Sequence, residues 1–422
     1  MRRVALGLAA GLLGAACAIA ESAGGAGNAD WPQWAGPSRN ATASAGGLFQ
    51  GPVELREAWR KPAREGISAL TVAAGRLFSL GTEAGFDVAF ALDAKTGKEL
   101  WQVRLGPANA NMEFAVTSTP ASDGKRVYVL GGACVLRALE AETGKEVWNH
   151  DLKAEFNPGP MANGCWTSPL LDGPLLVVQV NGEPDKLVMA FDAATGAVKW
   201  AAKGTIRAVR TSPAVADIGG VRQVVVHEGN KEQQGGLYGL RLTDGAQLWS
   251  LRFDPVQSFS FDTPLAFDGD RVAAVAWSEV RTVQVKKTGD AWKAELLWSA
   301  RDIRADNQPF TSHVVAHEGY LYGLGGDLLV CLEAATGKKI WQEKVYTGSL
   351  ILVDGHLVVL AQGSGLVRVV AATPEGYREK LRKQVFTPGA LSDVPPSFAD
   401  GRLYLRNAED LVAFEVVKAA PR

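Results

Sequence analysis

The sequence of 422 residues predicts an all-β fold, an eight-bladed β-propeller in which each blade is a four-stranded antiparallel sheet. The first observation is a repeated motif: "ALDAKTGKELW", which ends at Trp101, recurs as "ALEAETGKEVW" ending at Trp148 and in four further variants. The tryptophans that mark the repeats lie 42 to 52 residues apart, which is the period of a propeller blade. The second observation is composition: 47 glycines in a chain that is 47% hydrophobic are typical of many short strands joined by tight turns.

One repeat, residues 118–152, divides into four strands. "STPAS" is the expected inner strand and "GKRVYVLGG" the second, with Val127 and Val129 on one face and Tyr128 on the other. "CVLRALEA" is the third strand and "KEVWNHDL" the fourth. Segments similar to the first two strands occur in other repeats, such as "TSPLL" and "GRLFSLG", and support the same division there.

The motif itself predicts a hairpin turn between the third and fourth strands. Gly97 supplies a positive φ that a side chain resists, and Asp93 and Thr96 can hydrogen-bond the turn. Trp101 then lies on the outer strand, where a large flat side chain fills the wedge between neighbouring blades. The repeated tryptophans are therefore expected to be structural.

The count of repeats gives seven complete blades and an eighth built from both ends of the chain. Phe386 is expected to take the place of tryptophan in blade seven, and the hairpin of blade five to extend through "KKTGDAW". The C-terminus supplies three strands, near "PPSFA", "GRLYLRN" and "DLVAFEVV", and the N-terminal segment Val53–Pro62 supplies the fourth. This closure hides sheet edges and defines a propeller domain over residues 53–418.

The first residues predict export. Two arginines precede a short apolar run, so residues 1–20 are interpreted as a signal peptide cleaved after Ala20, and residues 21–52 as an N-terminal extended segment. The expected location is secreted or periplasmic, with no transmembrane span in the mature chain, because the apolar run is too short to cross a membrane comfortably. Lipidation at Cys17 is the alternative.

Charge and cysteines set further expectations. A formal net charge of −1 gives no electrostatic footprint for nucleic acid. The mature chain keeps Cys134, Cys165 and Cys331, an odd number with no CxxC. Buried thiols in strands are expected, and a Cys134–Cys165 disulfide is the alternative in an oxidising compartment.

The pattern A-x-D-x-x-T-G-x-x-x-W resembles the PQQ-like propeller repeat over most of residues 53–418. The eight-bladed members of that family include quinoprotein alcohol dehydrogenases and the BamB-type subunit of the outer-membrane assembly machinery. The opening "DWPQWAGPSRNATASAGGL" is similar to the start of secreted bacterial PQQ-binding-like β-propeller repeat proteins, with Ala35 where those have arginine.

The resemblance implies two kinds of function. In the dehydrogenases it implies PQQ held between a tryptophan and a ring of two adjacent disulfide-bonded cysteines, with a calcium ion bound by carboxylate and amide side chains. The sequence contains neither an adjacent Cys-Cys pair nor a haem CxxCH motif. We therefore expect a non-catalytic binding or scaffold module without a cofactor. The alternatives are a PQQ- and calcium-dependent oxidoreductase with a degenerate site and a BamB-like outer-membrane protein assembly factor.

Candidate site residues lie in the loops that lead into the inner strands, over the central channel. Trp166, Arg207 and Arg210 are the expected contacts of a ligand, because guanidinium groups favour carboxylates and an indole stacks on flat rings. Glu113 and Asp262 are the candidate oxygen ligands of calcium. The expected partner is a protein or a small acidic ligand. The same loops also carry Asn109, Asn111, Asn163, Asn307, Gln308 and His313. No residue is assigned a catalytic role, and the five histidines lack metal-ligand spacing.

Overall fold

The protein is described by a computed structural model. It describes residues 30–108, 117–156, 165–181, 186–203, 211–229, 235–253, 263–276, 279–301, 313–361, 363–389 and 394–419. The expected signal peptide therefore lies outside the described residues.

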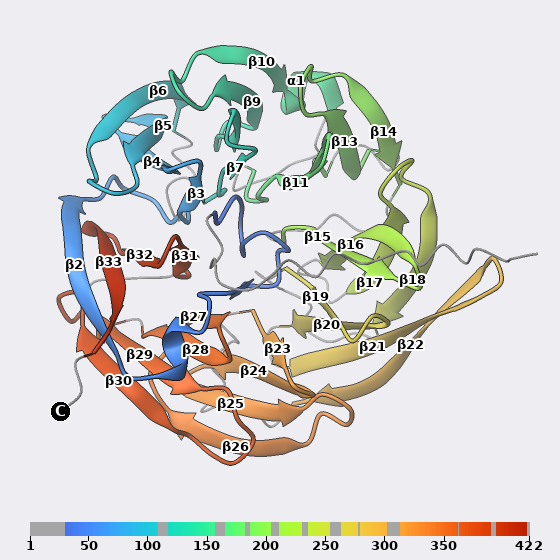
Figure 1. The fold of residues 1–422 in the computed structure, drawn as a ribbon. Helices are drawn as coiled ribbons and strands as arrows, with labels where there is room; N and C mark the ends of the chain where they lie inside the picture. Colours follow the sequence, from blue (N-terminus) through green and yellow to red (C-terminus); the bar gives the residue numbers. More distant parts are fainter. Residues whose placement is uncertain are drawn as a thin grey trace, which may run out of the picture.

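Eight sheets of short antiparallel strands surround a central channel (Figure 1), which confirms the predicted propeller. In the first seven blades, consecutive strands run from the channel to the rim. The strands of blades 1 to 4 are β3 (Thr71–Ala73), β4 (Arg76–Glu83), β5 (Phe86–Asp93) and β6 (Glu99–Pro107); β7 (Ala121–Ser122), β8 (Arg126–Leu130), β9 (Val135–Glu140) and β10 (Glu146–Asp151); β11 (Leu170–Asp172), β12 (Leu175–Gln179), β13 (Val188–Asp192) and β14 (Val198–Ala202); and β15 (Ala214–Ile218), β16 (Val221–Gly229), β17 (Gly235–Arg241) and β18 (Gln247–Phe253).

Blades 5 to 7 repeat this order, and blade 8 closes the ring. Their strands are β19 (Leu265–Phe267), β20 (Arg271–Ala276), β21 (Glu279–Thr288) and β22 (Ala291–Ala300); β23 (Val315–His317), β24 (Tyr320–Gly325), β25 (Leu328–Glu333) and β26 (Lys339–Lys344); β27 (Gly348–Val353), β28 (His356–Ala361), β29 (Leu366–Ala371) and β30 (Glu379–Gln384); and β31 (Ser397–Ala399), β32 (Arg402–Arg406), β33 (Asp410–Lys418) and β2 (Val53–Pro62). The remaining elements are β1 (Thr42–Ala43), the 3₁₀ turn η1 (Leu48–Gln50) and the helix α1 (Leu152–Phe156).

Blade 8 joins the two ends of the chain. Strand β2 pairs antiparallel with β33 along its whole length, from Val53 opposite Lys418 to Pro62 opposite Asp410. The predicted closure by an N-terminal strand is thus confirmed. Because the outermost strand of blade 8 comes from the other end of the chain, the ring cannot open without breaking this ladder.

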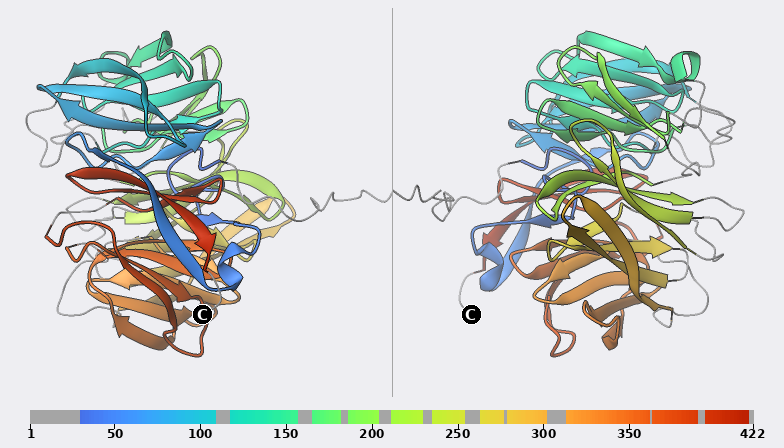
Figure 2. Two further views of the ribbon diagram at one scale, coloured as in Figure 1. Left: turned by 60° about the vertical axis from the view of Figure 1, so that its left-hand side comes forward. Right: turned by 90° about the vertical axis from the view of Figure 1, so that its right-hand side faces the viewer.

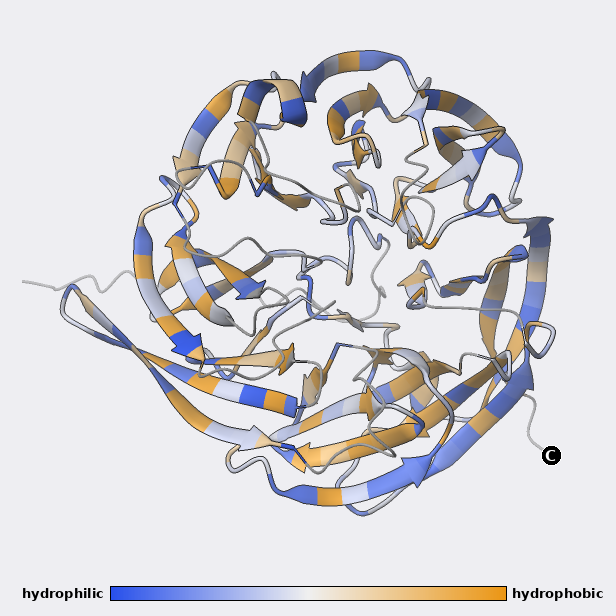
Figure 3. Ribbon diagram, turned by 180° about the vertical axis from the view of Figure 1, so that it is seen from behind, coloured by the Kyte–Doolittle hydropathy of each residue, from blue (hydrophilic) through white to orange (hydrophobic). Residues whose placement is uncertain are grey.

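Strands inside the disc are more hydrophobic than the strands at its rim. Strand β28, "HLVVLA", is buried at every position, whereas β30, "EKLRKQ", alternates between exposed and half-buried residues. Figure 3 shows this change as orange inner strands and mixed blue and orange outer strands. A strand covered on both faces by neighbouring blades reads as a continuous hydrophobic run, and a rim strand reads as an alternation.

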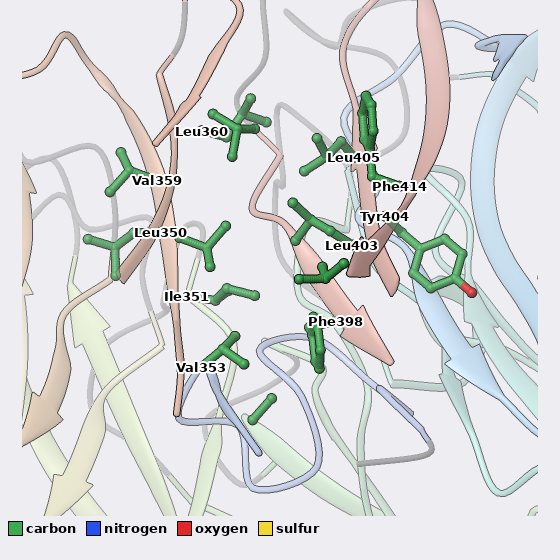
Figure 4. Close-up of a cluster of buried hydrophobic side chains, with 14 of the residues drawn as sticks. Leu350, Ile351, Val353, Val359, Leu360, Phe398, Leu403, Tyr404, Leu405 and Phe414 are labelled. Carbon is green, nitrogen blue, oxygen red and sulfur yellow. The ribbon is translucent and has the colours of Figure 1, made fainter. Parts of the chain in front are cut away.

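The largest apolar cluster lies around blades 6 to 8 and blade 1. Figure 4 shows part of it, where side chains of blade 7 such as Ile351 and Leu360 face Phe398, Leu403 and Phe414 of blade 8. These five residues are fully or almost fully buried. Facing sheets of a propeller pack in this way because each blade presents one apolar face to each neighbour.

The repeated tryptophan hydrogen-bonds the next blade. The Nε1 of Trp101 donates to the carbonyl oxygen of Ala141 at 3.0 Å, on the blade 2 turn that matches the Asp93–Gly97 turn of blade 1. Five other tryptophans make the same bond at 2.8 to 3.1 Å: Trp59 to Ala94, Trp148 to Ala193, Trp200 to Leu242, Trp298 to Ala334 and Trp341 to Thr373. The expectation that these tryptophans are structural and lie between blades is confirmed.

The glycine of the turn lies against the indole of the preceding blade. Gly144 has a φ of 73°, and a Cβ added there would lie 2.8 Å from the ring of Trp101. Gly97 likewise has a φ of 70°, and a Cβ there would meet Trp59 at 2.7 Å. The turn is held by Asp93, whose Oδ1 accepts the backbone N–H and the hydroxyl of Thr96 at 2.8 and 2.7 Å. Glycine is therefore required both for the left-handed backbone and for the approach of the ring.

A bulge precedes the tryptophan position in every blade. Trp101 pairs with Ala91, but Leu92 pairs with Glu99, so Leu100 is the extra residue. The same shift occurs between the third and fourth strands of the other seven blades. An extra residue bends and twists the outer strand, which turns the indole toward the next blade.

This register corrects the prediction for blade 7. Leu381, opposite Val369, occupies the tryptophan position, whereas Phe386 lies beyond the end of β30. The sequence spacing misled because the repeats vary in length, and strand register alone decides which residue faces the neighbour. Phe386 is nevertheless buried at 3% exposure, with the guanidinium of Arg60 5.8 Å from its ring centre.

Blades 4 and 5 meet differently. Trp249 donates to Gln223 of its own blade at 2.7 Å, because the extended hairpin of blade 5 has no Thr-Gly turn at the usual offset to receive it. The long hairpin of β21 and β22 instead projects beyond the disc (Figures 1 and 2), and Trp292 lies against Gly219 of blade 4. The predicted extension of this hairpin is confirmed.

The N-terminal residues 30–50, here called the plug, cross the central channel (Figure 1). Trp31 exchanges two backbone hydrogen bonds of 2.8 Å with Val72 of blade 1, and Pro32 accepts one from Ser122 of blade 2. Strand β1 then adds to blade 7, pairing parallel with Leu352 and Val353. Figure 2 shows the plug toward one face of the disc, the plug face, where the first strand of each blade ends. The opposite face, where blade-to-blade connections enter the first strands, is the loop face.

The indole contact gives a test with a matched control. Gly144→Ala and Gly75→Ala both place a side chain at a φ near 74°, but a Cβ at Gly75 meets nothing within 4 Å. Both variants should lose about 1 kcal/mol from the backbone, and Gly144→Ala a further 1–3 kcal/mol from overpacking against Trp101. Denaturant unfolding measures the difference. Equal losses would show that the indole contact does not stabilise the ring.

Candidate functional site

The candidate site is the loop-face end of the channel. Of the residues that the sequence predicted there, the structure describes Trp166 and His313. Arg207, Arg210, Glu113 and Asp262 lie outside the described residues, as do Asn109, Asn111, Asn163, Asn307 and Gln308. The site is therefore built from what surrounds Trp166 and from the neighbouring blades.

Trp166 lies at the head of blade 3, which is the loop-face end of its inner strand, between Cys165 and the residues that lead into β11. Its side chain is 8% exposed. The position agrees with the predicted channel mouth, and the small exposed fraction means that most of the indole packs within the protein.

A disulfide joins Cys134 to Cys165, with 5.2 Å between their Cα atoms. Cys134 lies between β8 and β9 with a φ of 69°, so the bond ties the loop-face end of blade 2 to the head of blade 3. The expectation of buried thiols in strands is wrong for these two residues, because the fold brings distant loops together. It is right for Cys331, a buried residue of β25 whose thiol pKa is raised to about 11 by burial.

Hydroxyl side chains link the heads of the inner strands. The backbone N–H of Ala69 donates to Thr119 Oγ1 at 3.0 Å, that of Thr119 to Ser168 Oγ at 3.0 Å, and that of Ser168 to Ser212 Oγ at 2.9 Å. Each bond crosses from one blade to the next, from blade 1 to blade 4. The repeated "TSP" that marks inner strands in the sequence is thus the signal for this chain of bonds, which the sequence analysis did not interpret.

His313 holds the corresponding place in blade 6. Its Nε2 lies 2.7 Å from the carbonyl oxygen of Leu350 in blade 7, and its ring meets Trp34 of the plug edge-on at 6.4 Å. Trp34 in turn donates to Thr263 Oγ1 of blade 5 at 2.8 Å. Burial lowers the pKa of His313 to about 4. This histidine is therefore a neutral link between blades and plug near pH 7.

A buried charged cluster lies between blades 4 and 5 at the loop face. Glu279 has no exposed side-chain surface and pairs with Arg281 and, at 2.9 Å, with Arg301. The Arg281 guanidinium stacks 4.5 Å from the ring centre of Phe253, which also meets His227 edge-on. Sequence reasoning missed this cluster, although charged residues in the strand "SEVRTVQV" were a signal that could have found it.

The cluster shifts the pKa values of its members. Burial, with a smaller effect of the Arg281 charge, lowers the pKa of His227 to about 4. Burial alone would raise the pKa of Glu279, but hydrogen bonds from Ser299 and Arg301 and the charge of Arg281 outweigh it and lower that pKa. Perturbed groups of this kind occur in binding sites and in structural ion-pair networks alike.

Between the plug and blades 5 and 6, on the plug face, lies a pocket of about 240 Å³ whose polar lining includes Asn40, Asp268, His317 and Tyr320. No group of three or more metal-ligating side chains occurs in the described part of the chain. No described helix is long and apolar enough to span a membrane.

Comparison with known proteins identifies one matching family model. The model described as outer membrane protein assembly factor BamB, of the PQQ repeat type, matches residues 84–309 and 278–415. No curated protein sequence matches the chain significantly.

Solved structures share the fold at low sequence identity. BamB from Moraxella catarrhalis is 14% identical with a TM-score of 0.59, covering 86% of this chain and 100% of its own. Quinohemoprotein alcohol dehydrogenase ADHIIG from Pseudomonas putida HK5 is 13% identical with a TM-score of 0.65, covering 93% and 81%. The quinohemoprotein alcohol dehydrogenase of Comamonas testosteroni is 14% identical with a TM-score of 0.51 and the same coverage. At such identities the likeness shows the fold alone.

The disulfide predicts the thiol count. The denatured, unreduced mature chain should show one reactive thiol, Cys331, and three after reduction. The double variant Cys134→Ala/Cys165→Ala should lower the free energy of unfolding by about 3 kcal/mol, because the bond closes a loop of 31 residues in the unfolded chain. Cys331→Ala serves as the single-site control. Three thiols without reductant would contradict the bond.

The buried histidines predict acid lability. His227 and His313 have pKa values of about 4 in the fold, below the ordinary value of 6.5. The unfolded chain therefore binds protons that the folded chain does not, and stability is lost as pH falls from about 6.5 to 4. Each histidine contributes about 1.4 kcal/mol per pH unit in that window.

The measurement is the free energy of unfolding across this pH window. His227→Leu should lower this slope by about 1.4 kcal/mol per pH unit, whereas Cys331→Ala, whose thiol has a pKa of about 11, should leave it unchanged in this window. A slope that His227→Leu does not alter would contradict the assignment.

Proposed function

The chain belongs to the PQQ-repeat family described as outer membrane protein assembly factor BamB, and from this premise we propose that it is a non-catalytic binding or scaffold module, secreted or periplasmic. Its partner is a protein or a small acidic ligand that docks at the loop face over the channel. The expected signal peptide supports the location.

The plug is the observation that supports this proposal best. It spans the channel at the plug face, with hydrogen bonds to blades 1, 2, 3 and 5 and a strand added to blade 7. One end of the central channel is thus filled by the chain itself, so the proposed partner would bind at the other end, the loop face. Loops set on a rigid framework suit the recognition of a partner.

The charge of the loop-face sequences indicates what that partner offers. Arg207 and Arg210 stand seven and four residues before β15, the inner strand of blade 4. Two neighbouring guanidinium groups favour carboxylates. We therefore expect an acidic group on the partner.

A second function has one observation in its favour. The Cys134–Cys165 disulfide ends at the residue next to Trp166, and the resemblance to the dehydrogenases implies PQQ between a tryptophan and a disulfide. In this chain the cysteines are 31 residues apart rather than adjacent. The alternative is a PQQ-dependent oxidoreductase with calcium held by Glu113 and Asp262. A BamB-like assembly role would require lipidation at Cys17, which a mature chain beginning at Glu21 lacks.

The proposal is tested by capture with a charge-reversed loop face. The mature chain, immobilised, should retain a partner from an envelope extract, and Arg207→Glu/Arg210→Glu should reduce the retained amount at least tenfold, because it removes the carboxylate-binding charge. Lys199→Glu on the outer strand β14 is the control and should retain it. Equal capture by all three proteins would contradict a loop-face partner.

A PQQ titration of the same preparations, followed by tryptophan fluorescence with and without calcium, separates the two functions. A scaffold should show no saturable quenching. Calcium-dependent saturable quenching that Trp166→Phe weakens would favour the oxidoreductase.

A further inference from the structure

The pocket on the plug face, where blades 5 and 6 meet the plug, has an apolar base. Its volume is about 240 Å³, and its lining includes Leu265 and Phe267 of blade 5 and Ala316 and Ala334 of blade 6. These four residues belong to the apolar cluster between the two blades or pack against it. The volume is below the roughly 300 to 1,000 Å³ of small-molecule sites. The pocket therefore suits a single side chain better than a cofactor.

The pocket forms because blade 5 leaves space against the first turn of blade 6. At the next junction the corresponding space is filled, since a Cβ added to Gly355 of blade 7 would lie 3.0 Å from the His317 ring of blade 6. Gly319 holds the same turn position in blade 6, and a Cβ added there would meet no atom of the described residues within 4 Å. The opening is thus specific to the residues of this junction and does not follow from the repeat.

Two carboxylates line the pocket, one from each blade. Asp268 and Glu318 hold corresponding positions in the turns that follow β19 and β23, with φ angles of 51° and 48°. Both side chains are at least half exposed. Asp268 lies 3.3 Å from Arg271, and Glu318 lies 4.0 Å from Nε2 of His317. Charge-assisted hydrogen bonds are shorter, about 2.7 to 2.9 Å, so both carboxylates can accept a further N–H donor.

The corresponding carboxylate of blade 7 shows which donors such a group takes. Asp354 has the same turn position, with a φ of 46°, and accepts the backbone N–H groups of Ala45 and Gly47 at 2.9 and 3.0 Å. The plug itself therefore supplies the donors in blade 7. At blades 5 and 6 the plug instead contributes Asn40 and Thr42 to the pocket wall, which leaves the mouth accessible to a donor from another molecule.

We infer that this pocket is a docking site for a lysine or arginine side chain of a partner protein. The methylene stem would pack on Leu265 and Phe267, as long charged side chains do on apolar surfaces. The charged end would reach Asp268 and Glu318, because ammonium and guanidinium groups donate to carboxylates.

The plug residues at the wall favour a protein segment over a free amine. The Asn40 amide and the Thr42 hydroxyl can hydrogen-bond the main chain that carries the basic side chain, and a free amine has no main chain to bond. The pocket lies on the face opposite the proposed loop-face partner, so this inference does not depend on that proposal.

The experiment is a titration of the mature chain with the peptide acetyl-Gly-Ala-Lys-Ala-Gly-amide at low ionic strength, followed by saturation-transfer NMR. Binding should be saturable and should weaken as salt is added. The same peptide with norleucine in place of lysine keeps the stem without the charge and should bind about tenfold more weakly. Asp268→Asn/Glu318→Gln should cause a similar loss, since each exposed ion pair contributes a few-fold in affinity. Ala316→Leu should abolish binding by filling the pocket.

Matched controls separate this site from general charge and from the loop face. Asp400→Asn removes the carboxylate at the same turn position of blade 8, where φ is 47°, and should bind the lysine peptide as the wild type does. Arg207→Glu/Arg210→Glu should also bind it normally, whatever that variant does to a loop-face partner.

Three results would overturn the site: no saturable binding of the lysine peptide, equal binding of the norleucine peptide, or equal binding by Asp268→Asn/Glu318→Gln. Binding of 1,5-diaminopentane as tight as that of the peptide would overturn the assignment to a protein segment.

Discussion

The packing of an indole on a glycine turn is the contact on which the ring depends. Six tryptophans of the outer strands hydrogen-bond a backbone carbonyl of the next blade, and at five of these junctions a glycine of the turn admits the ring because it has no Cβ. The bond is repeated at six junctions, so the angle between blades is set by the same local geometry. Where it is missing, other side chains replace it: Lys383 of blade 7 donates to Leu55 of blade 8 at 2.7 Å, and Trp292 covers blade 4.

Because the junctions between blades are alike, the blades differ mainly in the side chains that they present to the central channel. The plug fills it from one face and draws on buried polar groups of several blades, including Arg39, His313 and Trp34. The loop face carries the disulfide beside Trp166 and the Glu279–Arg281 cluster. These features are asymmetric in a fold whose blades are otherwise alike, and asymmetry in a repeat protein is where function is expected to reside.

The sequence predicted the fold well and the site only in part. Strand order, the closure by Val53–Pro62 and the structural tryptophans followed from the period of the motif. The site prediction depended on loop position alone, and of the five residues to which it assigned a role the structure describes only Trp166, at the expected end of the channel. The pocket lined by Asp268 and Glu318 was missed because it forms against an N-terminal segment with no repeat to place it, and the Cys134–Cys165 bond was left as an alternative because spacing carries no pairing information.

The sequence by itself determined what is local and periodic. The Asp-x-x-Thr-Gly turn and the alternation of the rim strands can be predicted from each repeat, because they depend on hydrogen bonds and φ angles within a few residues. The number of blades follows from the number of repeats. The tertiary structure decided what depends on distance in the chain: that Leu381 rather than Phe386 takes the tryptophan position, that two cysteines meet, and that the Arg39 guanidinium bonds Pro169. These outcomes follow from strand register and ring closure, which bring together residues that no local pattern relates.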